Sequence, residues 1–136
     1  MPFHRLIMED HTLYSKKVFE KLSNQGLSSG QPKILEYLAK HDGAVQRDIA
    51  HACMIEPATV TSLLSRMEKN GLIIRKMQED NRRFLYVYLT EHGKEEAAIV
   101  KNTFAEIEHN ACKGFTKDEI ERFTDYLMRL RNNLND

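Results

Sequence analysis

Residues 57–89 hold a helical pattern followed directly by two strand patterns, and this order limits the possible folds more than any other feature of the chain. Apolar residues in the first part follow the i, i+3, i+4, i+7 spacing of a helix that buries one face. They are Val60, Leu63, Leu64 and Met67. Pro57 suits the first position of a helix, and Gly71 suits the left-handed position just past its end. We therefore predict a helix over residues 57–70.

The opposite face of this helix is polar. It carries short hydrogen-bonding side chains and one cation, namely Thr59, Thr61, Ser62, Ser65 and Arg66. Two runs rich in Ile, Val, Tyr and Phe follow at residues 72–77 and 84–89, and the charged segment 78–83 joins them. The pattern predicts a helix that leads into a β-hairpin with a charged tip.

A shorter helical pattern precedes this region, over residues 46–53, with Ile49, Ala50 and Cys53 on one side. Residues 54–56 then form a three-residue turn. A short helix, a tight turn, a longer helix and a hairpin are the parts of a winged helix-turn-helix. In that fold the second helix enters the major groove of DNA, where short polar side chains let its backbone approach closely.

Helices are also expected on both sides of this region. Residues 3–22 form one candidate, and Ser28 with Gln31 has the spacing of a capping box for the next helix, with Pro32 in its first turn. After the hairpin, Thr90 is the expected N-cap of a long helix. A second capping box, Thr116 with Glu119, is expected to start the last helix.

The last two helical patterns each carry an apolar seam at alternating steps of three and four. The residues are Ala97, Val100, Phe104, Ile107 and Ala111, then Ile120, Phe123, Leu127, Leu130 and Leu134. A seam of this length packs against another helix, either within one chain or in a partner. Because a winged domain of about 65 residues already has its own core, we expect residues 1–26 and 91–136 to form a homodimer interface. Residues 27–90 then form the winged domain, with the helix pair at about 46–70 and the hairpin at about 72–89.

Composition narrows the function further. The chain has 136 residues with 20 basic and 20 acidic side chains, which argues against a nonspecific coat on nucleic acid. Basic residues outnumber acidic ones by six to four in residues 56–90, whereas acidic residues outnumber basic ones by ten to seven in residues 91–136. Two cysteines without CxxC spacing, and no apolar run long enough for a signal peptide or a membrane span, are typical of a cytoplasmic protein.

Taken together, these motifs resemble the MarR family of bacterial transcription regulators. The matching residues are Leu27-Ser28, Gln31, Ile34, Leu35, Asp48-Ile49-Ala50, Thr59-Val60-Thr61, Leu64, Met67-Glu68, Gly71-Leu72-Ile73, Arg75, Asn81-Arg82-Arg83, Leu89-Thr90 and Gly93. Two positions depart from the pattern of the family. Asn81 stands where an Asp is usual, which affects the bracing of the hairpin, and Val45 stands where Ser or Thr usually caps the first helix of the pair.

The resemblance implies a mainly α-helical fold with a small β-hairpin wing. It implies a dimeric regulator of transcription, most often a repressor, that binds a pseudo-palindromic operator in double-stranded DNA and is released by a small molecule. The DNA-binding residues would be the polar face of the 57–70 helix together with Asp80, Asn81, Arg82 and Arg83. Arg83 matches the family position that enters the minor groove, braced by Asp80 or Asn81. We also expect Leu85, Val87 and Leu89 to hold the hairpin against the core.

An effector pocket in such a protein would lie near the first, second and fifth helices, and His11, Tyr14 and Phe104 are its candidate lining residues. No cofactor or metal is expected. His109 and Cys112 lie one helical turn apart, yet a tetrahedral metal site needs two further ligands that the sequence does not single out. Cys53 lies on an apolar face, where burial makes a thiol unreactive, so Cys112 is the better candidate for redox sensing.

The remaining alternatives are an enzyme and a protein-binding module. The chain has no GxSxG, HExxH or glycine-rich phosphate loop, so no enzymatic activity is expected. A wing that binds protein would gain from an apolar tip, because the cores of protein interfaces are poor in charge. The tip here is Glu-Asp-Asn-Arg-Arg, which suits DNA better.

Overall fold

The computed structural model describes residues 1–78 and 81–135. Its elements, in chain order, are α1 (Phe3–Leu22), η1 (Ser23–Gln25), α2 (Gln31–Lys40), β1 (Ala44–Val45), α3 (Gln46–Cys53), α4 (Pro57–Lys69), β2 (Ile73–Gln78), β3 (Asn81–Leu89), α5 (Glu91–Ala111) and α6 (Lys117–Leu134). The chain divides into two compact units, residues 1–104 and 105–136. Each unit is described by itself.

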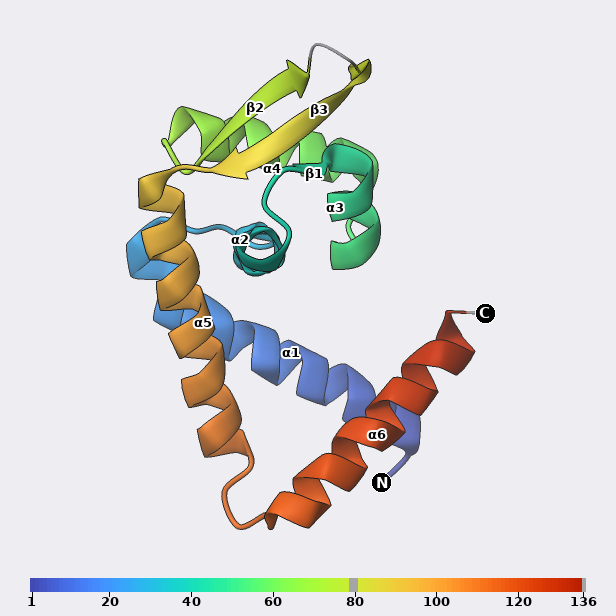
Figure 1. Ribbon diagram of the computed structural model, residues 1–136. Helices are drawn as coiled ribbons and strands as arrows, with labels where there is room; N and C mark the ends of the chain where they lie inside the picture. Colours follow the sequence, from blue (N-terminus) through green and yellow to red (C-terminus); the bar gives the residue numbers. More distant parts are fainter. Residues whose placement is uncertain (79–80, 136) are drawn as a thin grey trace. The chain divides into compact units, whose positions relative to one another are not determined.

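The first unit contains a small antiparallel sheet with the strand order β1-β3-β2. In Figure 1 the helices α2 and α3 lie beneath this sheet, and the far end of the β2–β3 hairpin projects beyond them. The predicted mainly helical fold with a hairpin wing is therefore confirmed. The second strand is longer than predicted, because β3 begins at Asn81, which pairs with Gln78, and residues 81–83 therefore belong to the strand instead of the connection.

A single core joins the helices of the first unit to the sheet. Ile34, Leu35, Leu38 and Ile49 from α2 and α3 are fully buried in it, and so is Val87 from β3. Leu89 is also buried as predicted, whereas the prediction for Leu85 is wrong, since its side chain is 40% exposed. The third strand explains the difference. β1 pairs with β3 only at residues 86–87, so the supported part of the sheet ends before Leu85.

The predicted capping box at the start of α2 is also wrong. The helix begins at Gln31, and its N-cap is Gly30 with a φ of +92°, a left-handed conformation that favours glycine. An added Cβ at Gly30 would lie 2.8 Å from Leu63 Cδ1. Ser28 lies two residues before this N-cap, and its hydroxyl does not cap the helix. The hydroxyl is buried and has no hydrogen-bond partner among the described residues.

The junction between the wing and α5 is held by Thr90, which is the N-cap predicted from the sequence. Its hydroxyl accepts a hydrogen bond from Gly93 N at 3.0 Å and donates one to Gly71 O at 2.6 Å. The Thr90 N–H donates to Leu72 O at 3.0 Å. Gly93 lies against the same carbonyl so closely that a Cβ there would overlap the Leu72 oxygen. Glycine at this position therefore sets how closely α5 approaches the end of the wing.

The second unit contains the last turns of α5 and the whole of α6. The predicted capping box at the start of α6 is confirmed, since Glu119 N donates to Thr116 Oγ1 at 3.1 Å and Thr116 N donates to Glu119 Oε1 at 2.8 Å. Two residues of the apolar seam of α6, Phe123 and Leu127, are about half exposed. None of the described helices is both long enough and apolar enough to cross a membrane.

Candidate nucleic-acid interface

Helix α4 has one buried and one exposed face, and its phase agrees with the sequence prediction. Val60, Leu63, Leu64 and Met67 are each at most 3% exposed, so this stripe anchors the helix in the core. The predicted polar face is exposed along its whole length and consists of Thr59, Thr61, Ser62, Ser65 and Arg66. The structure thus presents five polar side chains on a helix that the core holds fixed.

The turn between α3 and α4 sets the direction of α4. Met54 adopts a left-handed conformation with a φ of 54°, the only positive φ outside glycine in the described part of the chain. Ile55 N then donates to Ala50 O at 3.0 Å, which closes the turn back onto α3. Val45 provides no side-chain cap for α3, as its identity predicted, and Asp48 supplies a negative charge in the first turn instead.

Arg75 on β2 joins the wing to both helices of the helix-turn-helix. Its Nη2 donates to Glu68 Oε1 at 3.0 Å and to Ser65 Oγ at 3.3 Å, and its Nη1 donates to Gln46 Oε1 at 3.3 Å. The Arg75 backbone N–H also donates to Glu68 Oε2 at 3.0 Å. The Arg75 side chain is only 16% exposed, so these bonds fix its position. The hydrogen bond from Arg75 also lowers the pKa of the Glu68 carboxyl.

The five polar residues on α4 fall into two groups. The hydroxyls of Thr61 and Ser65 bond within the protein, because Thr61 Oγ1 donates to Pro57 O at 3.1 Å and Ser65 Oγ donates to Thr61 O at 3.0 Å. Gln46 Nε2 also donates to Thr61 Oγ1 at 3.4 Å. Within residues 1–78 and 81–135, by contrast, the side chains of Thr59, Ser62 and Arg66 have no hydrogen-bond or ion-pair partner. These three are open to an external ligand.

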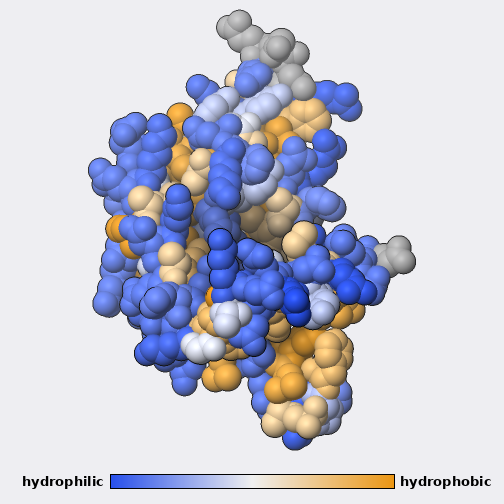
Figure 2. Space-filling model, turned by 60° about the horizontal axis from the view of Figure 1, so that its bottom comes forward, coloured by the Kyte–Doolittle hydropathy of each residue, from blue (hydrophilic) through white to orange (hydrophobic). Residues whose placement is uncertain are grey.

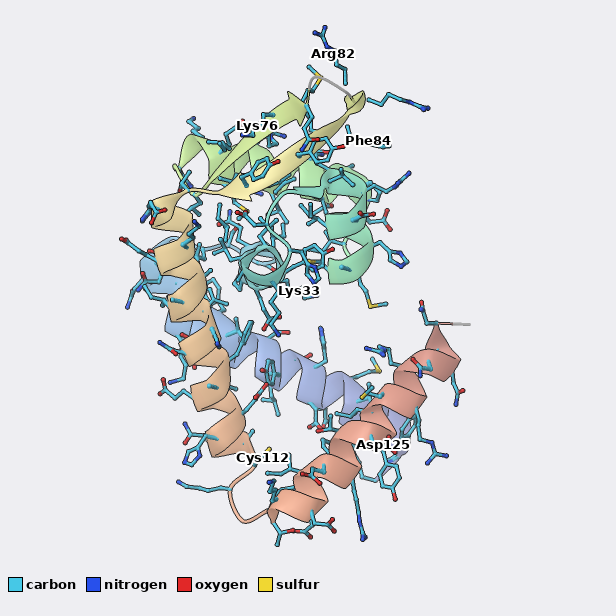
Figure 3. All side chains as sticks on the ribbon, viewed as in Figure 1. Lys33, Lys76, Arg82, Phe84, Cys112 and Asp125 are labelled. Carbon is cyan, nitrogen blue, oxygen red and sulfur yellow. The ribbon has the colours of Figure 1, made fainter. Side chains whose placement is uncertain are left out.

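The wing adds positive charge beside α4. Arg82 lies at the end of the hairpin, where Figure 3 shows its side chain extending away from the sheet, and Arg83 is exposed next to it. Nearer the helices, the Arg47 guanidinium of α3 lies 5.3 Å from the ring centroid of Phe84, which ties the wing to α3. The predicted contributions of Asp80 and of the Asn81 side chain lie outside the described residues.

The Lys76 ammonium makes a second cation–π contact with the wing, 4.6 Å from the ring centroid of Tyr88. Gln78 Nε2 donates to the hydroxyl of the same tyrosine at 3.2 Å. Both contacts cross from β2 to β3 on one face of the hairpin. They stiffen the hairpin between its base and its charged end.

The remaining candidate residues lie on other elements of the described chain. His11 is exposed, Tyr14 is 38% exposed, and Phe104 is half-buried against the core. Burial raises the pKa of the Cys53 thiol, as predicted, while Cys112 is more accessible. No group of three or more potential metal ligands occurs among residues 1–78 and 81–135.

Gln46, Glu68 and Arg75 belong to this site, although the sequence patterns do not single them out as binding residues. The contact between Gln46 and Arg75 spans 29 residues, so no local pattern reveals it. One signal was available, because an acid and an arginine flanking Gly71 on consecutive elements can pair across the turn.

Comparison with known proteins agrees with this geometry. The model of the MarR family matches residues 27–84. The chain is 27% identical to the uncharacterised HTH-type transcriptional regulator YdgJ of Bacillus subtilis over 110 residues, which is 81% of this chain and 67% of that protein. It is also 27% identical to the homoprotocatechuate degradative operon repressor of Escherichia coli over 107 residues, covering 78% of this chain and 72% of the repressor.

A similar solved structure is that of a MarR family transcriptional regulator of Listeria monocytogenes in complex with a 26-mer DNA. It aligns with a TM-score of 0.92 at 25% identity and covers 98% of this chain and 89% of that one. Members of the family are transcriptional regulators and not enzymes. The winged helix-turn-helix, the polar face of α4 and these similarities lead to one conclusion: residues 27–84 form a winged helix-turn-helix of the MarR type, and the chain is similar over most of its length to MarR family transcriptional regulators.

Proposed function

We propose that this protein is a homodimeric, sequence-specific DNA-binding repressor whose α4 reads the major groove of a pseudo-palindromic operator. The observation that carries the proposal is the polar face of α4, which is exposed while its apolar face is fully buried. The arginines of the wing, Arg82 and Arg83, would contact the backbone and the minor groove beside each half-site. Such a regulator works on chromosomal DNA in the cytoplasm of a bacterium.

Its relatives support DNA as the ligand and repression as the effect on transcription. The Listeria monocytogenes regulator was crystallised with DNA, and the Escherichia coli relative is named as an operon repressor. The protein-binding alternative fits less well, because the exposed face of α4 and the described end of the wing carry hydroxyls and cations instead of large apolar groups.

The proposal of a dimer rests on apolar side chains that a lone chain leaves exposed. In the first unit, Phe3, Leu13 and Phe19 of α1 are each at least 60% exposed, and in the second unit Phe123 and Leu127 of α6 are about half exposed. Exposed apolar side chains, coloured orange, are visible on the face that Figure 2 presents. Monomeric proteins rarely expose so many large apolar groups on their terminal helices. A second copy of the chain would cover them, and residues 1–26 and 91–136 would form the interface.

We further propose that a small molecule releases the protein from DNA by binding near α1 and α5. Tyr14 on α1 and the half-buried Phe104 on α5 supply aromatic surface, and His11 supplies a polar group one turn from Tyr14. Val18, one turn beyond Tyr14, packs on the same core as Phe104. A ligand here would act on the helices that carry the proposed dimer interface.

Three experiments test the proposal. Selection from a random pool of duplexes should yield an inverted repeat whose half-sites are about one helical turn apart, ~10 base pairs centre to centre. Sedimentation should show a dimer at micromolar concentration, and deletion of residues 115–136 should abolish specific binding. A full-length monomer that still binds an inverted repeat tightly would refute the dimer, and a pool that acquires no shared sequence would refute specific recognition.

A further inference from the structure

The hydrogen bonds around Arg75 run in one direction, and this direction determines what α4 can offer to DNA. An arginine only donates and an ionised glutamate only accepts, so the bond from Arg75 to Glu68 has one possible polarity. The bond from Arg75 to Gln46 fixes the amide of Gln46, because Oε1 must face the arginine. The amino group Nε2 of Gln46 must then face Thr61, to which it donates.

The hydroxyls of Thr61 and Ser65 lie at the ends of this chain of hydrogen bonds. Each hydroxyl has one proton and two lone pairs. Thr61 gives its proton to Pro57 O and receives a bond from Gln46, while Ser65 gives its proton to Thr61 O and receives a bond from Arg75. Each side chain therefore keeps a single lone pair, and no proton, for an external partner.

We propose that Thr61 and Ser65 face the major groove as hydrogen-bond acceptors only and select amino-bearing bases, adenine or cytosine, at the positions they contact. In the major groove the donors are the N6 amino group of adenine and the N4 amino group of cytosine, whereas guanine and thymine offer acceptors there. A free serine or threonine hydroxyl could bond either kind of base or a phosphate. The bonds to Pro57 O and Thr61 O take the two protons and remove this choice, while Gln46 and Arg75 each occupy one lone pair and so limit where the remaining one can accept. The inference rests on the proposed DNA binding by α4.

Ser62 provides a comparison on the same face. It lies beside Thr61, is exposed, and has no hydrogen-bond partner among the described residues. Its hydroxyl can donate or accept, so its base preference is not restricted by the protein. If the network restricts Thr61 and Ser65, the base preference at their positions should differ from the preference at the Ser62 position.

The test begins with the selected operator and full-length protein. The affinities of Thr61→Val, Ser65→Ala and Ser62→Ala are each measured for operator duplexes that carry every base at every position. The operator position whose base preference is lost in a variant is assigned to the residue that was replaced. At the Thr61 and Ser65 positions the preferred base should be adenine or cytosine. Replacing it with purine or pyrimidin-2-one, which lack the amino group, should weaken wild-type binding about 3- to 10-fold per half-site and leave the matching variant unchanged.

Gln46→Met supplies the test of the network itself. It keeps the length of the side chain, removes the bond to Thr61 and leaves Arg75 held by Glu68. Because Pro57 O still accepts the Thr61 proton, the preference for an amino group should persist at both positions. Wild-type affinity that does not fall when the amino group is removed at either position would overturn the proposal while DNA binding stands, as would an unchanged preference in Thr61→Val and Ser65→Ala or a loss of the preference in Gln46→Met. Wild-type protein that binds no sequence specifically would overturn both this inference and the proposed function.

Discussion

Substitution of Gly93 by alanine should destabilise the protein, although glycine to alanine ordinarily stabilises a helix by up to ~1 kcal/mol. Gly93 lies in the first turn of α5, and an added Cβ would overlap the Leu72 carbonyl oxygen. To make room, α5 must move away from the end of the wing. That movement breaks the bonds from Thr90 N to Leu72 O and from Thr90 Oγ1 to Gly71 O.

The expected size follows from these losses. Two hydrogen bonds contribute ~0.5–1.5 kcal/mol each, and forced overlap in a packed region adds ~1–3 kcal/mol. After the gain in helix propensity, the net loss should be about 1–5 kcal/mol, which for a chain of this length lowers the Tm by roughly 4–20 °C.

Thermal unfolding followed by circular dichroism at one fixed protein concentration measures the effect, since a dimer unfolds in a concentration-dependent way. Ala98→Gly, at an exposed position of the same helix, is the control and should lose about 1 kcal/mol through propensity alone. A Gly93→Ala protein as stable as the wild type, or more stable, would refute the close approach of α5 to the wing.

Three further changes probe the core, the wing and the cysteines. Leu64→Ala should lower the free energy of unfolding, measured in urea, by ~2–5 kcal/mol, because that side chain is fully buried. Ser62→Ala, at an exposed position, should change it by less than ~0.5 kcal/mol. A larger loss for Ser62→Ala than for Leu64→Ala would mean that the phase of α4 is wrong. Arg83→Ala should weaken binding to all sequences and reduce the slope of log affinity against log salt by about one to two phosphate equivalents per dimer; equal affinities and parallel slopes would remove Arg83 from the interface. A thiol reagent should modify Cys112 well before Cys53, whose pKa is raised by burial, and faster reaction at Cys53 would contradict that burial.

Sequence patterns predicted the parts of the fold that depend on local periodicity. The bounds of α1 and α3, the two faces of α4 and the caps at Thr90 and Thr116 all follow from spacing and capping chemistry within a few residues. The capping pattern at Ser28 gave the wrong helix start, because the left-handed Gly30 is the N-cap and side-chain spacing does not reveal backbone conformation.

Features that depend on distant contacts were not predictable in this way. Leu85 matches the alternation of its strand, yet it is exposed because the short β1 ends before reaching it. The role of Arg75 depends on Gln46 and Ser65, which lie on two other elements. Knowing that Thr61 and Ser65 lie on the polar face of a helix did not reveal that their protons are already bonded to the protein.

The most direct test of the account removes the three residues of α4 that have no partner among the described residues. A protein with Thr59, Ser62 and Arg66 all replaced by alanine keeps the buried face of the helix and the network around Arg75. Its affinity for the selected operator and for a scrambled duplex should be titrated beside that of the wild type at one salt concentration. We predict an unchanged urea midpoint and a ratio of specific to scrambled affinity that falls at least tenfold; a ratio equal to that of the wild type would contradict the claim that α4 reads the operator.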